Sequence, residues 1–130
     1  MKPQAAAYLE KSDQSLDKAR RVLAIDLPDE AGRHAYFAQF HAAQALIFER
    51  TDKIAKSHKG VSSQFHKLAK SDSADGVKLA RDLSATYHFK EAADYETGTA
   101  ALISADDAHA AIATAVEFPA VIRRVLTPGP

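Results

Sequence analysis

Four polar side chains share one stripe of an otherwise apolar helical segment, and their types suit either an ion pair or an anionic ligand. At 3.6 residues per turn they fall within an arc of about 100°. Guanidinium groups hold carboxylates or phosphates, and imidazoles exchange protons near neutral pH. The stripe consists of Arg33, His34, His41 and Gln44.

Arg33 needs an anionic partner if it is buried, because an unpaired charge inside a protein is costly. Asp94, next to Tyr95, lies near the apolar face of a later helical segment. We therefore predict an Arg33–Asp94 ion pair inside the protein, forming with Tyr95 a polar cluster that fixes how the helices align. The alternative is that the stripe contacts a ligand.

The two histidines of the stripe do not predict a metal site. Seven residues of helix place His34 and His41 roughly 10.5 Å apart along the axis, too far to hold one ion together. Neither Glu-x-x-His nor His-x-x-x-His occurs in the sequence. We expect neither a metal nor any other cofactor.

A basic run lies between residues 53 and 70 and contains no acidic residue. Such a run favours an anionic partner, phosphate or nucleic acid, and the alternative is a solvated connection. Aromatic residues do not alternate with the basic ones, and no glycine-rich phosphate loop accompanies them. The run holds Lys53, Lys56, His58, Lys59, His66, Lys67 and Lys70.

The composition fits one domain of 130 residues that needs no covalent staple, since it has no cysteine. Lys plus Arg and Asp plus Glu are 17 each, so net charge predicts no partner. No apolar stretch is long enough to cross a membrane, and the N-terminus lacks the pattern of a signal peptide. We therefore expect a cytoplasmic protein with no membrane contact.

Apolar residues recur three and four apart along most of the chain, which predicts helices. We expect long helices over residues 4–25, 28–50 and 74–96, and a last one capped by Ser104 and kinked by Pro119. A short helix should cover 60–70, between a loop at 51–59 and a turn at 71–76, and 97–98 should end the third long helix. The predicted fold is all-α, an up-and-down bundle of four long helices and one short helix, in a single domain of residues 1–130 with a tail at 127–130. The helix over 28–50 should be central.

Three stretches together resemble the HEPN domain superfamily. They are Arg-His-Ala-Tyr-Phe-Ala-Gln-Phe-His-Ala at 33–42, Lys-Ser-His-Lys-Gly-Val at 56–61 and Ala-Asp-Tyr-Glu at 93–96. The chain looks most like the small stand-alone branch of that superfamily, over about residues 5 to 126. The resemblance implies a helical bundle, often a homodimer, that binds a minimal nucleotidyltransferase in a toxin–antitoxin or defence pair.

The resemblance also implies RNA or nucleotide as ligand and, in many members, metal-independent endoribonuclease activity from an arginine and a histidine. Arg81 and His88 match that pattern formally, with Asp82 after the arginine. A histidine can move the proton of the 2′-hydroxyl or leaving group, and an arginine can hold the charge that develops on phosphate. The alternative is that Arg81 and His88 are an inert surface pair.

A second hypothesis is a non-catalytic bundle that binds nucleotide or protein. In it, residues of the second helix and the following loop would form a phosphate-binding pocket or a dimer contact. These residues are Arg33, Tyr36, His41, His58 and Lys59. A third hypothesis is that all these polar residues serve only to fix how the helices align in an oligomer.

Overall fold

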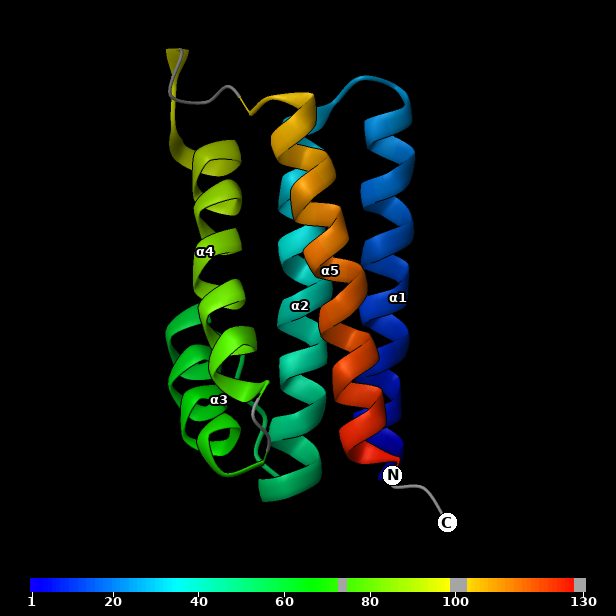
Figure 1. Cartoon of the computed structure of the whole chain (residues 1–130), viewed down its shortest axis with the longest axis vertical. Helices are drawn as coiled ribbons and strands as arrows, with labels where there is room; N and C mark the ends of the chain where they lie inside the picture. Colours follow the sequence, from blue (N-terminus) through cyan, green and yellow to red (C-terminus); the bar gives the residue numbers. More distant parts are fainter. Residues whose placement is uncertain (73–74, 99–102, 128–130) are drawn as a thin grey trace.

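The computed structural model describes residues 1–72, 75–98 and 103–127 of the chain, and these residues form five helices and no strand. The predicted all-α class and helix bundle are confirmed. Helices α1 and α2 run antiparallel, as do α4 and α5, whereas the neighbours α2 and α5 run in the same direction; the shorter α3 lies beside one half of α4 (Figure 1). They are α1 (Pro3–Ala24), α2 (Pro28–Thr51), α3 (His58–Asp72), α4 (Gly76–Tyr95) and α5 (Ala105–Leu126).

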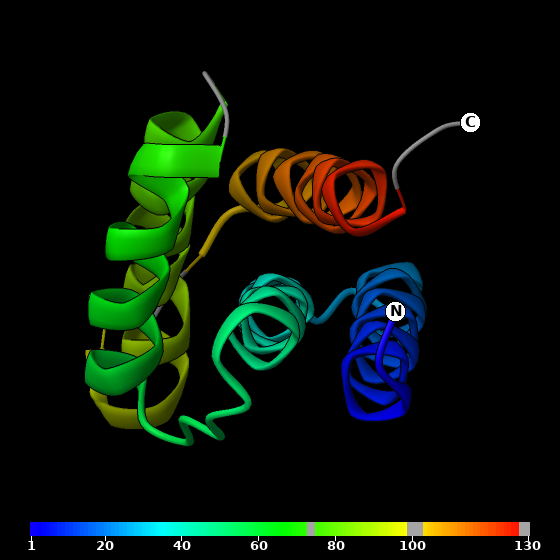
Figure 2. The ribbon, with the colours of Figure 1, turned by 90° about the horizontal axis from the view of Figure 1, so that it is seen from below.

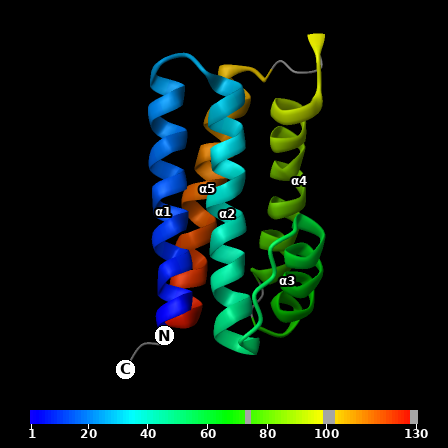
Figure 3. The ribbon, with the colours of Figure 1, turned by 180° about the vertical axis from the view of Figure 1, so that it is seen from behind.

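Helix α2 contacts each of the other four helices, which confirms its predicted central place. Seen along the bundle, α1, α2 and α5 form a triangle, while α3 and α4 pack as a pair on the other side of α2 (Figure 2). The view from behind shows α2 between α1 and α4 (Figure 3). Tyr36, Phe40, Ala43 and Ile47 of α2 are buried, as the helical spacing predicts.

Small residues let α1 and α2 approach closely. Ser12 of α1 is fully buried, and its hydroxyl donates a 2.6 Å hydrogen bond to the carbonyl of Ala38 in α2. Ala19, Ala35 and Ala38 are also fully buried in one cluster with α5 residues. Alanine exposes no polar group and leaves room for the facing backbone, so these positions set how tightly the helices pack.

The prediction that α3 begins at Gly60 is wrong, because the helix begins at His58. The Ser57 hydroxyl accepts a 3.0 Å hydrogen bond from the Gly60 N–H, which makes Ser57 the N-cap. The cap pulls His58 and Lys59 into the first helical turn, so the predicted loop ends earlier. Helix α3 also continues through Asp72, where a turn was expected; residues 73–74 lie outside the described residues.

The start of the last helix agrees with the prediction from the sequence. Ser104 caps α5 by accepting a 3.0 Å hydrogen bond from the Asp107 N–H, as predicted. Helix α5 runs through Pro119 without interruption, and the predicted kink there stays a prediction. Near its C-terminal end, Arg123 makes a 2.7 Å ion pair with Asp13 of α1. No helix within the described ranges is both long and apolar enough to span a bilayer.

Candidate functional site

One hollow between α2, the start of α3 and α4 brings together two of the sequence-predicted site residues, Tyr36 and His58. We call it the α2–α4 cleft, and its volume is about 220 Å³. Its aromatic lining comes mostly from α2 and α4, and its lysines come from the loop before α3 and from α4. It is lined by Tyr36, Phe37, Phe40, Lys56, His58, Tyr87 and Lys90.

Three rings form the inner wall of the cleft. The Tyr36 hydroxyl and His58 Nδ1 are 2.7 Å apart and hydrogen-bonded. The His58 ring stacks on Tyr87 with centroids 3.6 Å apart and planes 7° from parallel. Tyr36 is only 1% exposed, so it supports the other two rings from beneath.

Burial sets the protonation states of this wall. Burial raises the pKa of Tyr36 far above its ordinary value, so the phenol keeps its proton. Burial also lowers the pKa of His58, partly opposed by the negative charge of Glu91, so the imidazole is neutral at pH 7. When the Tyr36 hydroxyl donates to Nδ1, the proton of the neutral ring resides on Nε2. That N–H is then available to a ligand in the cleft.

Two ordered contacts hold the loop that carries Lys56. Gln44 Nε2 donates a 2.7 Å hydrogen bond to the carbonyl of Ala55, and Ser57 caps α3 on the other side. Lys56 itself makes no ion pair with any described residue. Its charge is therefore free to meet an anion.

Asp94 joins the second lysine of the cleft to Arg33. Lys90 Nζ is 2.9 Å from Asp94 Oδ2, and Arg33 Nε is 2.9 Å from Asp94 Oδ1. Burial by itself would raise the pKa of Asp94, but the hydrogen bond from Lys90 and the charge of Arg33 outweigh it and hold that pKa below its ordinary value. The carboxylate thus stays ionised and fixes both cations at the rim.

The predicted Arg33–Asp94 ion pair is present, but its predicted place inside the bundle is wrong. The Arg33 side chain is 33% exposed and that of Asp94 is 23% exposed. The reason is that α2 is not covered all round: the stripe that carries Arg33 faces the open side between α1 and α4. Tyr95 is 69% exposed and does not join the pair; its ring instead lies 5.1 Å from Lys90 Nζ.

Two other predicted ligand residues lie outside the cleft. His41 Nδ1 is hydrogen-bonded to Gln44 Oε1 at 2.8 Å, and the ring lies in a neighbouring hollow against α1. Lys59 is exposed in the first turn of α3 and does not line the cleft. The cleft therefore unites only Tyr36 and His58 of the predicted ligand set.

Sequence reasoning missed Tyr87 and Lys90 as site residues. They are three positions apart, so they share a face of α4, but the same face carries core residues and Tyr87 reads as one of them. Nothing in the local pattern indicates that this face meets His58.

Arg81 and His88 are both exposed on α4, about 10.5 Å apart along the helix axis. Neither lines the α2–α4 cleft. The His88 ring contacts only Phe89 among the described aromatic rings, with centroids 5.9 Å apart. The chain thus leaves this pair on a solvent-facing stripe, and its catalytic role stays a prediction.

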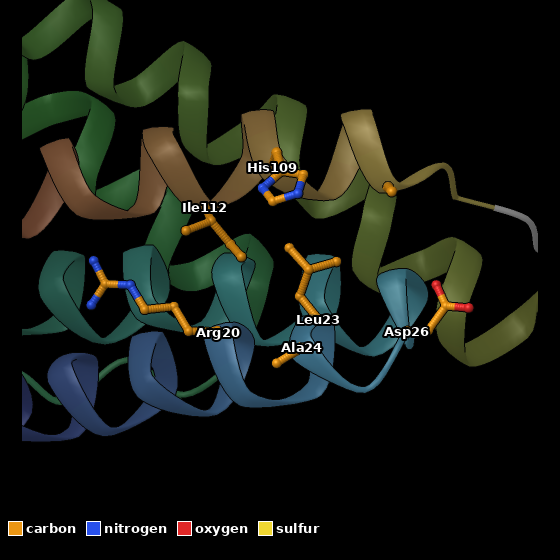
Figure 4. Close-up of a pocket in the computed structure, with 7 residues that line it drawn as sticks. Arg20, Leu23, Ala24, Asp26, His109 and Ile112 are labelled. Carbon is orange, nitrogen blue, oxygen red and sulfur yellow. The ribbon is translucent and has the colours of Figure 1, made fainter.

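The described residues hold no cluster of three or more His, Asp or Glu side chains placed to bind a metal ion. A larger hollow, about 540 Å³, lies between the end of α1 and the start of α5 and includes none of the predicted site residues. Leu23 and Ile112 lie within it, and Arg20 and Asp26 lie at its opposite ends (Figure 4). Its remaining lining residues are Ala24, Ala105 and His109, so it does not combine two lysines with an aromatic wall as the α2–α4 cleft does.

The chain matches a known protein-family model. The family model of the HEPN domain matches residues 5–125, which is nearly the whole chain. No curated protein matches this chain. The family match covers every residue of the α2–α4 cleft and all five helices except the first two residues of α1 and the last residue of α5.

Proposed function

Because this chain belongs to the HEPN domain family, we propose that it is a nucleotide- or RNA-binding module that holds a phosphate-bearing ligand in the α2–α4 cleft. Membership in the family supports a helical module related to nucleotides or RNA in general. The more specific assignment to this cleft comes from the arrangement of its side chains.

The observation that carries the proposal is the position of Lys56 and Lys90 beside the stacked rings of His58 and Tyr87. Ammonium groups bind phosphate oxygens through charge-assisted hydrogen bonds. A flat aromatic surface beside them is what a nucleobase stacks on. Neutral His58 adds a hydrogen-bond donor, because its Nε2 carries a proton without the ring having to become charged.

Calorimetric titration with UMP and with ATP tests the proposal. Lys56→Gln should weaken binding about tenfold or more, because hydrogen bonds to charged groups contribute about 1.5–3 kcal/mol. Lys59→Gln is the matched control, since Lys59 is exposed, lies three residues away and does not line the cleft. Equal effects of the two changes, or no binding by the unmodified chain, would refute the assignment of the cleft.

We also propose that the module works beside a minimal nucleotidyltransferase in a toxin–antitoxin or defence pair, and that it is a homodimer. Support for both comes from the family alone. Co-expression with the nucleotidyltransferase from a neighbouring reading frame, followed by size-exclusion chromatography, tests them together. Separate elution of the two proteins would remove the first proposal, and a monomeric mass would remove the second.

Metal-independent RNA cleavage is a second candidate function, favoured by the exposure of Arg81 and His88 on one face of α4. Because both side chains are open to solvent, an RNA phosphate could reach them without any rearrangement. His88→Ala should then abolish cleavage of RNA in the presence of EDTA. Cleavage that survives this change would exclude His88, and the chain would remain a binding module without catalysis.

A further inference from the structure

A second polar hollow lies next to the α2–α4 cleft, between α1 and α2, and we call it the α1–α2 groove. Its volume is about 240 Å³. Cationic and polar side chains of α1 form one wall, and the histidine stripe of α2 forms the other. It is lined by Lys11, Gln14, Ser15, Lys18, His34, Phe37 and His41, and no acidic side chain is among them.

The two lysines of the groove have the same spacing along α1 as the two histidines have along α2. Lys11 and Lys18 are seven residues apart on α1, and His34 and His41 are seven apart on antiparallel α2, so each pair spans about 10.5 Å of helix. Both lysines are exposed, and neither makes an ion pair with a described residue.

The three acidic residues of α1 are Glu10, Asp13 and Asp17, and none of these described residues lines the groove or makes an ion pair with Lys11 or Lys18. Asp13 is engaged with Arg123 at 2.7 Å, and Asp17 with Arg21 at 3.1 Å. At 100° per residue, both aspartates lie more than 100° around the helix from Lys11. Glu30 is the nearest acid to the groove on α2, with its carboxylate 3.9 Å from His34 Nε2.

Burial and the lysines of α1 lower the pKa values of the groove histidines. Burial is the main cause that lowers the pKa of His41, and the positive charges of Lys11 and Lys18 lower it further. Burial likewise lowers the pKa of His34, and Arg33 and Lys18 contribute, against the raising effect of Glu30. The groove is thus a site of positive potential with neutral rings in its wall.

Phe37 belongs to the lining of both hollows, so they adjoin. On one side, the Phe37 and His41 rings are stacked with centroids 6.1 Å apart. On the other, Phe37 contacts Tyr36 at 5.3 Å, and Tyr36 leads to the His58–Tyr87 stack.

Five cations stand along the row of rings, and two of them, Arg33 and Lys90, share the carboxylate of Asp94. The guanidinium of Arg33 lies 5.2 Å from the centroid of Phe37, in the middle of the row. Lys56 and Lys90 stand at the cleft end, and Lys11 and Lys18 at the groove end. Apart from buried Tyr36, the rings of the row are partly exposed. Partly exposed rings flanked by cations are the arrangement by which proteins bind single strands, because cations follow the backbone and rings stack on bases.

We propose that the α1–α2 groove is a second phosphate-binding subsite, and that the ligand of the two hollows together is a single-stranded oligonucleotide that crosses Phe37. This inference rests on the proposed function, because it extends the ligand of the cleft. A mononucleotide would occupy only one hollow. A duplex keeps its bases paired and stacked on one another, so it cannot offer them to the rings.

Fluorescence anisotropy with labelled oligouridylates of two, four and eight nucleotides tests the inference, with UMP binding measured in parallel. Affinity should rise at least tenfold from the dimer to the octamer. Lys11→Gln with Lys18→Gln should weaken octamer binding about tenfold and leave UMP binding unchanged. The control is Lys67→Gln with Lys70→Gln, two exposed lysines of α3 outside both hollows.

Salt dependence gives a second readout of the same variants. Each phosphate contact on a single strand adds about 0.7 to the slope of log affinity against log salt. Loss of both groove lysines should therefore reduce that slope by about 1.4, whereas the control pair should leave it unchanged. Thermal melting of each variant verifies that the bundle is folded.

The possible outcomes separate the two proposals. If UMP binds and depends on Lys56, but the groove variant keeps octamer affinity and salt slope, the groove is not a subsite and the cleft assignment stands. If a duplex of the same length competes as well as the single strand, the inference is wrong. If neither UMP nor any oligouridylate binds, the proposed function fails as well.

Discussion

Replacing Gln39 by methionine should stabilise the protein. Gln39 lies in the middle of α2 and is fully buried, with 0% of its surface exposed. Neither its Nε2 nor its Oε1 has a hydrogen-bond partner among the described residues. Methionine has a similar length and, like glutamine, is unbranched at Cβ and Cγ, and its helix propensity is close to that of glutamine.

The expected gain follows from the cost of the buried amide. A buried polar group without a partner costs about 1–3 kcal/mol, and removing both polar atoms recovers that cost. We therefore expect the free energy of unfolding to rise by about 2 kcal/mol. For a domain of this size, that corresponds to a rise in Tm of roughly 6 °C.

Urea unfolding monitored by circular dichroism gives the free energy, and a thermal melt gives the Tm. Gln14→Met is the matched control, because Gln14 lies in the middle of α1 and its side chain is exposed to solvent. This substitution should change the free energy of unfolding by less than about 0.5 kcal/mol. If Gln39→Met leaves stability unchanged or lowers it, the amide is hydrogen-bonded in solution, and the reasoning from its burial is refuted.

Two further changes test the packing and the electrostatics of the bundle. Gly76→Ala should lower the free energy of unfolding by about 1–3 kcal/mol, because the added Cβ would clash with the carbonyl oxygen of Ala69 in α3. A more stable variant in urea unfolding would contradict this close approach. Acid should also destabilise the protein, since burial is the main cause that lowers the pKa of His34, His41 and His58 from 6.5, so the unfolded chain binds protons first. The free energy of unfolding should fall as the pH drops below about 6.5 and be level above it, and equal values at about pH 7.5 and pH 5.5 would count against buried neutral histidines.

Much of the fold could be predicted from the sequence because helix signals are local. Apolar residues three and four apart define which face of each helix is buried, and Ser104 caps α5 through a residue only three positions away. The error at the start of α3 was local as well. Gly60 suggested the helix start, yet Ser57 could be recognised as a cap from the same few residues.

The candidate site was only partly predictable, since its members come from three separate stretches of chain. His58 stacks on Tyr87 across 29 positions of sequence, and Arg33 reaches Asp94 across 61. Spacing within one helix gives the face of a residue but not which helix lies opposite. It therefore suggested the Arg33–Asp94 pair yet placed it in the interior.

The sequence by itself determined the helices, the central place of α2 and the family, because each depends on patterns within a few turns of one helix or on the order of short motifs. Only the tertiary structure decided that the rings of Phe37, Tyr36, His58 and Tyr87 form one row, with cations from four segments beside it. The basic run of residues 53–70 does not itself contain such a row, because the rings that contact His58 belong to α2 and α4. Packing of long helices side by side is what places residues that are distant in the chain within reach of one ligand.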